Sequence, residues 1–180
     1  MDDSRRRCHT VMLVGEGFAG SGAEAAHVNT VLGERDGPVG AAFTTALASP
    51  TAGHTPFLVV AQPGLAVQPP TLFVPKATVA DDGDGRRHAE LTWGPAQSGV
   101  AEGVVAALDE GLVDPTEVVH LVLVAAVWVD PAAQDGAAVR ANNRQATLDA
   151  LRAGAVGFPT VTDLLAVRDQ VWNPFDPPTH

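Results

Sequence analysis

The 180-residue sequence contains a single cysteine, Cys8, and a single lysine, Lys76. One cysteine excludes an intramolecular disulfide framework and any metal site built from several cysteines, and a free thiol fits a reducing compartment. The chain has 11 basic residues, so ten of them are arginine. The one lysine stands inside an apolar run, residues 71–79, where a charged side chain is unexpected. This placement marks Lys76 as a candidate functional residue.

Positive charge and long apolar runs are also scarce. Asp and Glu number 21 against 11 Lys and Arg, which gives a net charge of −10. An acidic surface repels phosphate backbones and anionic lipid heads, which argues against a nucleic-acid or membrane-surface partner. No apolar run approaches the roughly 20 residues of a membrane helix. The apolar stretch after Arg5–Arg7 is too short for a signal peptide, so we expect a cytoplasmic protein.

Hydrophobic residues make up 46% of the chain, enough to build a sizeable core. A chain of this length has room for one domain. We expect a flexible N-terminal arm at residues 1–10, a domain at residues 11–156, and an irregular proline-rich tail at residues 157–180.

The order of predicted elements indicates the fold class. Apolar and β-branched runs predict strands at residues 11–15, 25–32, 57–61, 71–79 and 118–129. Helical spacing predicts helices at residues 38–47, 95–110 and 131–152, the last of them capped by Asp130. Residues 80–90 carry charges of both signs and two glycines, which favours an exposed loop. We predict a single α+β domain, with one mixed or antiparallel sheet and helices on one face.

The predicted strand at residues 25–32 carries the first candidate for chemistry. Alternation along a strand places Ala26 and Val28 on one face, and His27 and Asn29 on the other. An imidazole in this position is suited to act as acid or base near neutral pH, although most lone histidines are structural. The six histidines show no metal-ligand spacing, so we predict no metal site.

Three further segments bear on the site. Gly15, Gly17 and Gly20 match the pattern G-x-G-x-x-G, but a strand follows where a dinucleotide site needs a helix. We therefore expect a glycine-rich loop at residues 15–22 that lines a site without holding a phosphate. Lys76 and Thr78 lie two apart and share one side of a strand. Gln97 lies in the first turn of a helix, where its carboxamide can offer a donor and an acceptor to a planar ligand.

Taken together, these motifs resemble a known family. Gly15-Glu16, Gly22-x-Glu24-x-Ala26-His27, Lys76-x-Thr78 and Gly94-Pro-Ala-Gln97 follow one another in an order and at spacings similar to those of the formaldehyde-activating enzymes. The similarity extends over residues 11–153, which is most of the chain.

The resemblance implies both an activity and a set of site residues. Members of the family are lyases that condense formaldehyde with tetrahydromethanopterin, a co-substrate, to give the methylene derivative and water without a metal. The family's proton donor falls on His27. Its pterin-contacting positions fall on Asn29, Leu58, Lys76, Thr78 and Gln97. The resemblance further implies a left-handed β-α-β crossover and assembly into a homopentamer.

The sequence leaves other functions open. The family commonly has aspartate at the position of Asn29, and an amide there loses the charge of a carboxylate. One alternative is a non-catalytic protein that binds a pterin or formaldehyde. Another is an enzyme of the same fold that acts on a different aldehyde or amine carrier. A Schiff base between Lys76 and formaldehyde is a chemically possible variant of the mechanism.

Overall fold

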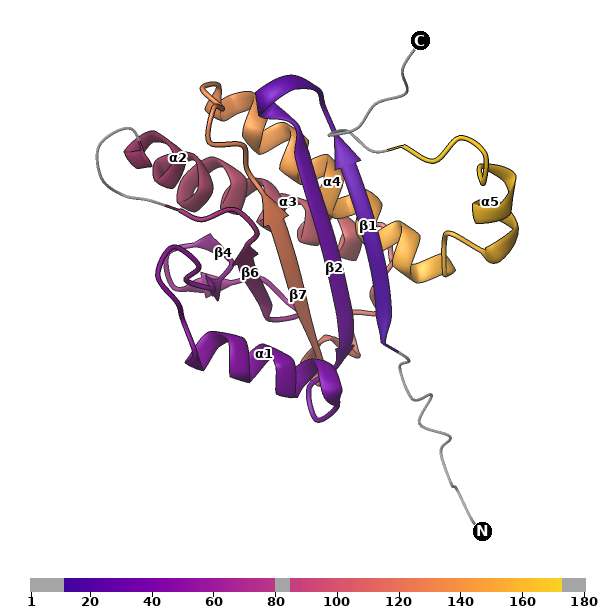
Figure 1. Ribbon diagram of the computed structural model, residues 1–180. Coiled ribbons are helices and arrows are strands. Elements are labelled where there is room, and N and C mark those ends of the chain that lie inside the picture. Colours follow the sequence, from indigo (N-terminus) through magenta and orange to yellow (C-terminus); the bar gives the residue numbers. More distant parts are fainter. Residues whose placement is uncertain (1–11, 80–84, 173–180) are drawn as a thin grey trace.

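The computed structural model describes residues 12–79 and 85–172 (Figure 1). The predicted arm at residues 1–10 lies outside these ranges. The strands are β1 (Leu13–Ala19), β2 (Ala26–Glu34), β3 (Phe57–Leu58), β4 (Val60–Gln62), β5 (Leu65–Ala66), β6 (Thr71–Pro75) and β7 (Leu121–Trp128). The helices are α1 (Pro38–Ala48), α2 (Gly85–Leu91), α3 (Gln97–Asp109), α4 (Gly136–Val156) and α5 (Val161–Ala166).

Within the described ranges, five strands form one mixed sheet in the order β1-β2-β7-β6-β3, and β4 and β5 form a separate hairpin. Neighbouring strands are antiparallel except β6 and β7, which are parallel. In Figure 1 both of these strands point upward, β7 lies to the right of β6, and the helices that connect them run behind the sheet. The crossover is therefore left-handed, and the predicted α+β class with a mixed sheet is confirmed.

The two faces of the sheet are covered unequally. The larger core lies between one face and helices α3 and α4, and it includes Val28, Phe73 and Leu123. On the opposite face α1 buries Val39 and Phe43 in a smaller cluster. The expectation that helices occupy one face is thus wrong for α1, because the second face also carries apolar side chains at one end.

The predicted glycine-rich loop at residues 15–22 is instead mostly strand, since β1 continues to Ala19. Its glycines alternate with larger residues, which is the period of a strand. A Cβ at Gly15 would overlap the carbonyl oxygen of Ala150 in α4, and one at Gly17 would overlap that of Ala146. The glycines therefore let α4 pack directly against the backbone of β1.

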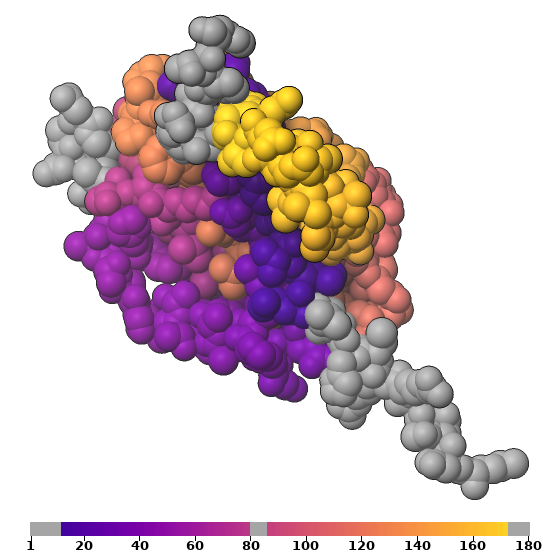
Figure 2. Space-filling model, turned by 45° about the vertical axis from the view of Figure 1, so that its right-hand side comes forward, coloured from indigo at the N-terminus to yellow at the C-terminus, as the bar shows by residue number. Residues whose placement is uncertain are grey.

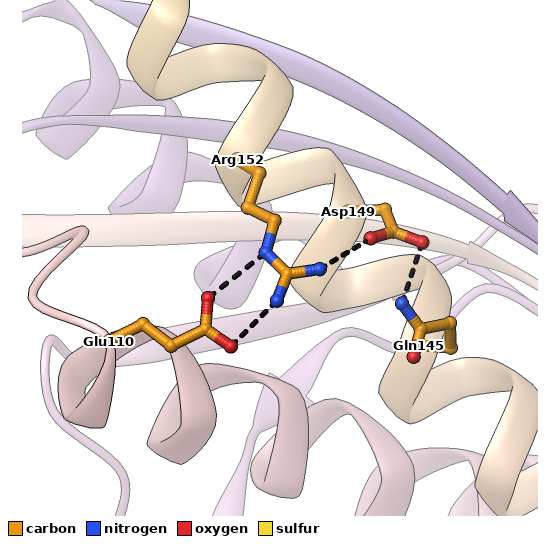
Figure 3. A network of polar contacts seen from close by, with 4 residues as sticks. All are labelled: Glu110, Gln145, Asp149 and Arg152. Atoms are coloured by element: carbon orange, nitrogen blue, oxygen red, sulfur yellow. Dashed lines mark hydrogen bonds and ion pairs between the residues drawn. The ribbon is translucent and has the colours of Figure 1, made fainter.

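Helices α3 and α4 are held together by close packing at a glycine and by charged hydrogen bonds. Gly103 of α3 lies against Thr147 of α4, with no room for a side chain. The Arg152 guanidinium donates two hydrogen bonds to Glu110, at 2.7 and 3.0 Å, and one to Asp149 at 3.1 Å (Figure 3). These contacts fix the helical layer behind the sheet.

Three other boundaries differ from the prediction. Residues 85–90 are not an exposed loop but belong to α2, whose His88 is buried and donates to the Val129 carbonyl oxygen. Helix α4 begins at Gly136 with Asp135 as its cap, because Asp130 instead accepts a hydrogen bond within a turn. The described part of the predicted tail, residues 157–172, is not wholly irregular, since it contains α5, whose cap Thr160 and Asp163 form reciprocal hydrogen bonds. Residues 173–180 of the predicted tail lie outside the described ranges. None of the helices in the described part of the chain has the length and apolarity needed to cross a membrane.

Candidate active site

Helix α1 covers only half of the sheet face that lies opposite α3 and α4, and the other half is open. Helix α1 packs on the half that carries Leu72 and Val122. In Figure 2, orange atoms of β7 are visible at the surface between the indigo atoms of the N-terminal strands and neighbouring purple atoms. The open half holds the start of β2 and the end of β7, where His27 pairs with Trp128 and Asn29 pairs with Ala126. The structure therefore places the two polar residues predicted on β2 on an accessible surface.

His27 forms the centre of a small polar cluster. Its Nε2 lies 2.9 Å from Oε1 of Glu16, and the two side chains are 32% and 61% exposed. Glu16 shares the face of His27 because it is paired with Asn29 across β1 and β2. The Nε2 atom is shielded from water, and the Glu16 carboxylate is its close charged neighbour. Because the Glu16 side chain is 61% exposed, a rotation of its carboxylate away from the imidazole would open Nε2 to a ligand.

Lys76 reaches the same cluster from the other side of β7. Its backbone N–H donates to the Val127 carbonyl oxygen at 2.8 Å, which continues the pairing of β6 and β7 by one residue. Its Nζ donates to the backbone carbonyl oxygen of His27 at 3.3 Å. The predicted strand at residues 71–79 ends at Pro75, so Lys76 directly follows the last residue of β6.

The cluster shifts the protonation of both basic groups. Burial lowers the pKa of Lys76 to about 8, and the Glu16 carboxylate opposes this shift. The pKa of His27 is lowered first by burial and then by the positive charge of Lys76, while Glu16 raises it. Lys76 therefore releases its proton far more readily than an ordinary lysine, and the proton of His27 is more acidic than usual.

Thr78 lies beyond Lys76 and is engaged by a histidine that sequence analysis did not select. His54 Nδ1 lies 3.1 Å from the Pro75 carbonyl oxygen, which can only accept, so Nδ1 donates. Its Nε2 lies 3.1 Å from the Thr78 hydroxyl. His54 thus fixes the turn that carries Lys76 and Thr78. No sequence pattern links it to this turn, because the contacts cross more than 20 residues of chain.

Leu58 and Gln97 are not brought to His27 within one chain. Leu58 is 42% exposed and pairs with Leu72, about 13 Å along β6 from Lys76. Gln97 is buried at the start of α3, where its Oε1 accepts from the Val60 N–H at 2.6 Å. Gln97 borders an open groove of about 670 Å³ between the β4–β5 hairpin, α3 and α4. Both residues thus lie at the β3 end of the sheet, opposite the β1 end that holds Glu16.

The chemistry of the cluster follows from its three groups. An imidazole can move one proton, a carboxylate can hold the positive charge that results, and an amine of lowered pKa can bind or attack a carbonyl compound. Glu16 was missed as the partner of His27 because residues 15–22 were interpreted as a loop. Alternation along a strand would have put Glu16 on the face of His27.

The protein is thus an α+β domain whose open sheet face carries an imidazole, a carboxylate and an amine in one cluster. A family model for formaldehyde-activating enzyme (Fae) matches residues 14–176. The chain is 40% identical over 162 residues to a bifunctional enzyme Fae/Hps of Archaeoglobus fulgidus, covering 90% of this chain and 40% of that protein. It is 39% identical over 160 residues to the corresponding enzyme of Methanococcoides burtonii, covering 89% of this chain and 39% of that protein.

The chain therefore belongs to the formaldehyde-activating enzyme family, as its motifs predicted. It spans about two fifths of the length of these bifunctional relatives. Family membership agrees with an enzyme that acts on formaldehyde.

Proposed function

We propose that the protein condenses formaldehyde with tetrahydromethanopterin to give methylene-tetrahydromethanopterin and water. The observation that supports this most is the position of His27, an imidazole on an open sheet face between a carboxylate and an amine. In this reaction the protein is a carbon–oxygen lyase of the hydro-lyase type. It serves formaldehyde detoxification and one-carbon metabolism in the cytoplasm, and the pterin is a co-substrate.

The difficult step is the loss of hydroxide from a carbinolamine. A pterin ring amine adds to formaldehyde, and the hydroxyl that forms is a poor leaving group until it is protonated. His27 acts as the general acid: its proton converts the hydroxyl to water, and the second ring amine traps the iminium. Acid catalysis of this kind contributes roughly 10²–10⁴-fold. Holding both amines near the carbon adds a proximity effect.

The pterin contacts are assigned by the family resemblance. Asn29, Lys76 and Thr78 would bind the polar edge of the pterin beside His27. Leu58 would supply an apolar wall and Gln97 a further polar contact, but both lie at the other end of the sheet. We infer that a complete site combines the open face of one copy with the β3 end of the next.

The C-terminal segment also supports an assembly in which neighbouring copies complete each other's sites. Residues 157–172 are exposed throughout and include Leu164, Leu165 and Trp172, each more than half exposed. Helix α5 stands away from the body of the molecule (Figure 1). Apolar surface of this kind is typical of a protein interface. We propose a homopentamer in which this segment packs on a neighbour. Light scattering should report five copies, and a Leu164→Asp, Leu165→Asp variant should dissociate.

Asn29 favours a second function. A neutral amide two residues from His27 gives less support to a protonated imidazole than a carboxylate would. The alternative is therefore a pterin- or formaldehyde-binding protein without catalysis, or an enzyme for another aldehyde or amine carrier.

One measurement separates these functions. Methylene-tetrahydromethanopterin formation is followed with and without the protein, because the uncatalysed reaction also proceeds. The proposed enzyme accelerates it. A binding protein shows pterin affinity with the background rate unchanged, and an enzyme for another carrier accelerates only with that carrier. Either of the last two results would reject the proposed reaction.

A further inference from the structure

We propose that Lys76 is a covalent carrier of formaldehyde, which its Nζ captures as an iminium before the carbon passes to the amine substrate. The inference deepens the proposed function and rests on it for the identity of that acceptor. It changes the role of Lys76 from a contact of the pterin to a group that bonds to the reacting carbon.

The placement of Lys76 suits this role. Its backbone is anchored to β7, and its Nζ is held against the carbonyl oxygen of His27, beside the proposed general acid. Among the residues that the structure describes, the charged groups that face this amine are Glu16 from β1 and His27 from β2. The amine therefore lies within one polar cluster together with a group that can move protons.

A lysine used only to hold an anion would be expected to remain fully charged. Burial instead lowers the pKa of Lys76 to about 8, so about a tenth of it is free amine at pH 7. The free fraction of an ordinary lysine at that pH is below about one in a thousand. The single lysine of the chain is thus a far better nucleophile at pH 7 than an ordinary lysine.

The capture step balances without any further reagent. The Lys76 ammonium gives one proton to His27, and the free Nζ attacks the formaldehyde carbon while the C=O π bond breaks. A second nitrogen proton moves to the oxygen, which gives a neutral carbinolamine. His27 then returns its proton to the hydroxyl, the C–O bond breaks, and water leaves. The products are the Lys76 iminium and water.

The transfer step balances in the same way. An amine of the pterin attacks the iminium carbon and loses its proton to His27. That proton then goes to Nζ as the bond between Nζ and carbon breaks. The second pterin amine closes on the same carbon, and its proton completes the Lys76 ammonium. No oxidant or reductant is consumed, and the sum is formaldehyde plus pterin giving methylene-pterin plus water.

The two basic groups assist one another during capture. The positive charge of Lys76 is one of the causes that lower the pKa of His27. This charge is absent from the neutral carbinolamine, so the imidazole holds a proton more firmly at the stage when a proton is needed. The iminium restores the charge after the water has left.

The single lysine allows a direct trapping experiment. The protein is incubated with labelled formaldehyde and cyanoborohydride at pH 7, and methylation is mapped by peptide mass spectrometry, which separates Lys76 from the N-terminal amine. We expect Lys76 to be methylated roughly 100-fold faster than Nα-acetyl-lysine. Unfolding the protein in urea should abolish the advantage. Equal rates for the folded protein and the free amino acid would overturn the proposal.

A pulse–chase experiment tests whether the adduct lies on the reaction path. The wild-type protein is mixed with labelled formaldehyde and then, within one turnover, with tetrahydromethanopterin and excess unlabelled formaldehyde. Label that appears in the first methylene-pterin supports covalent capture. Complete dilution of the label would overturn it. The Lys76→Arg variant keeps the positive charge and should lose both the trapped label and most of the acceleration.

The two proposals fail in different ways. Rapid trapping at Lys76 without any accelerated methylene-pterin formation would reject tetrahydromethanopterin as the acceptor and leave capture supported. Accelerated condensation that survives in Lys76→Arg, with no label retained in the chase, would reject the covalent role and leave the proposed function standing.

Discussion

The two faces of the sheet are built from the same strands and differ in almost every property. The face beneath α3 and α4 is apolar and tightly packed, and its glycines admit helix backbone at contact distance. The face that α1 only half covers carries Glu16, His27 and Asn29 within a few residues of one another. Each strand therefore contributes to stability with one set of alternate residues and to chemistry with the other.

This difference shows how a small domain can keep ionisable groups partly desolvated without weakening its core. The strands that carry His27 and Glu16 are fixed by α4 from behind, so the open face needs no helix of its own at that end. Burial there is enough to lower the pKa of Lys76 and of His27, yet both remain reachable.

Gly15→Val should have the largest effect, and it should act on stability. A side chain at Gly15 would overlap the Ala150 carbonyl oxygen, and neither backbone can yield without separating α4 from β1. We expect a loss of about 3 kcal/mol or more in the free energy of unfolding, measured by denaturant titration.

The matched control is Val14→Ala, one residue away on the open face. Val14 is 53% exposed, so its truncation should change the free energy of unfolding by less than about 1 kcal/mol. Equal losses in the two variants would mean that the faces do not differ as described.

His27→Ala should have the next largest effect, and it should act on catalysis. Removal of the general acid should lower the acceleration of methylene-pterin formation by roughly 10²–10⁴-fold. Thermal unfolding and pterin binding should be nearly unchanged, because the side chain lies on the open face. His120→Ala is the control, since His120 is exposed and its imidazole makes no hydrogen bond within the described residues. Full rate in His27→Ala would reject the acid role.

Much of the fold could be predicted from the sequence because strand and helix periods are local. The alternation of Ala26 and His27, the proline at the start of α1 and the apolar run of β7 all give the observed elements. The left-handed crossover came only from family resemblance, since right-handed crossovers are the general rule. Gly15 and Gly17 were misinterpreted because glycine marks a turn in one context and a close helix contact in another.

Strand alternation also explains why part of the candidate site could be predicted from the sequence. His27, Asn29 and Lys76 converge because β2 and β6 flank β7, and strand alternation gives each residue its side. Glu16 follows the same alternation once residues 13–19 are recognised as a strand, whereas His54 acts through contacts between distant segments, which a sequence pattern does not record. Leu58 and Gln97 were assigned to the site by family resemblance alone. Both lie far from His27 within one chain, so no local sequence pattern connects them to it.

Glu16→Gln should have a smaller effect, because it removes charge from the open face and keeps the shape of the side chain. Glu16 raises the pKa of both His27 and Lys76, so both values should fall. The pH midpoint of Lys76 methylation should move below about 8, and the condensation rate at pH 7 should drop roughly tenfold because less His27 is protonated. Unchanged values would show that Glu16 does not act on the cluster.

Asn29→Asp should have the smallest effect, and in the opposite direction. Asn29 lies two residues from His27 on the same strand face, at a spacing of roughly 6–7 Å. A carboxylate there adds negative charge beside the imidazole and raises its pKa, which burial and Lys76 otherwise lower. Because the proposed mechanism requires the acid form of His27, the rate should fall as pH rises through this pKa, and a higher pKa should move that fall to higher pH. We expect an increase of less than about tenfold in the rate at pH 7 with tetrahydromethanopterin.

The pH–rate profiles of the wild-type protein and the Asn29→Asp variant decide whether this expectation holds. An unchanged profile, or a loss of activity in the aspartate variant, would mean that the amide of Asn29 is matched to a different ligand.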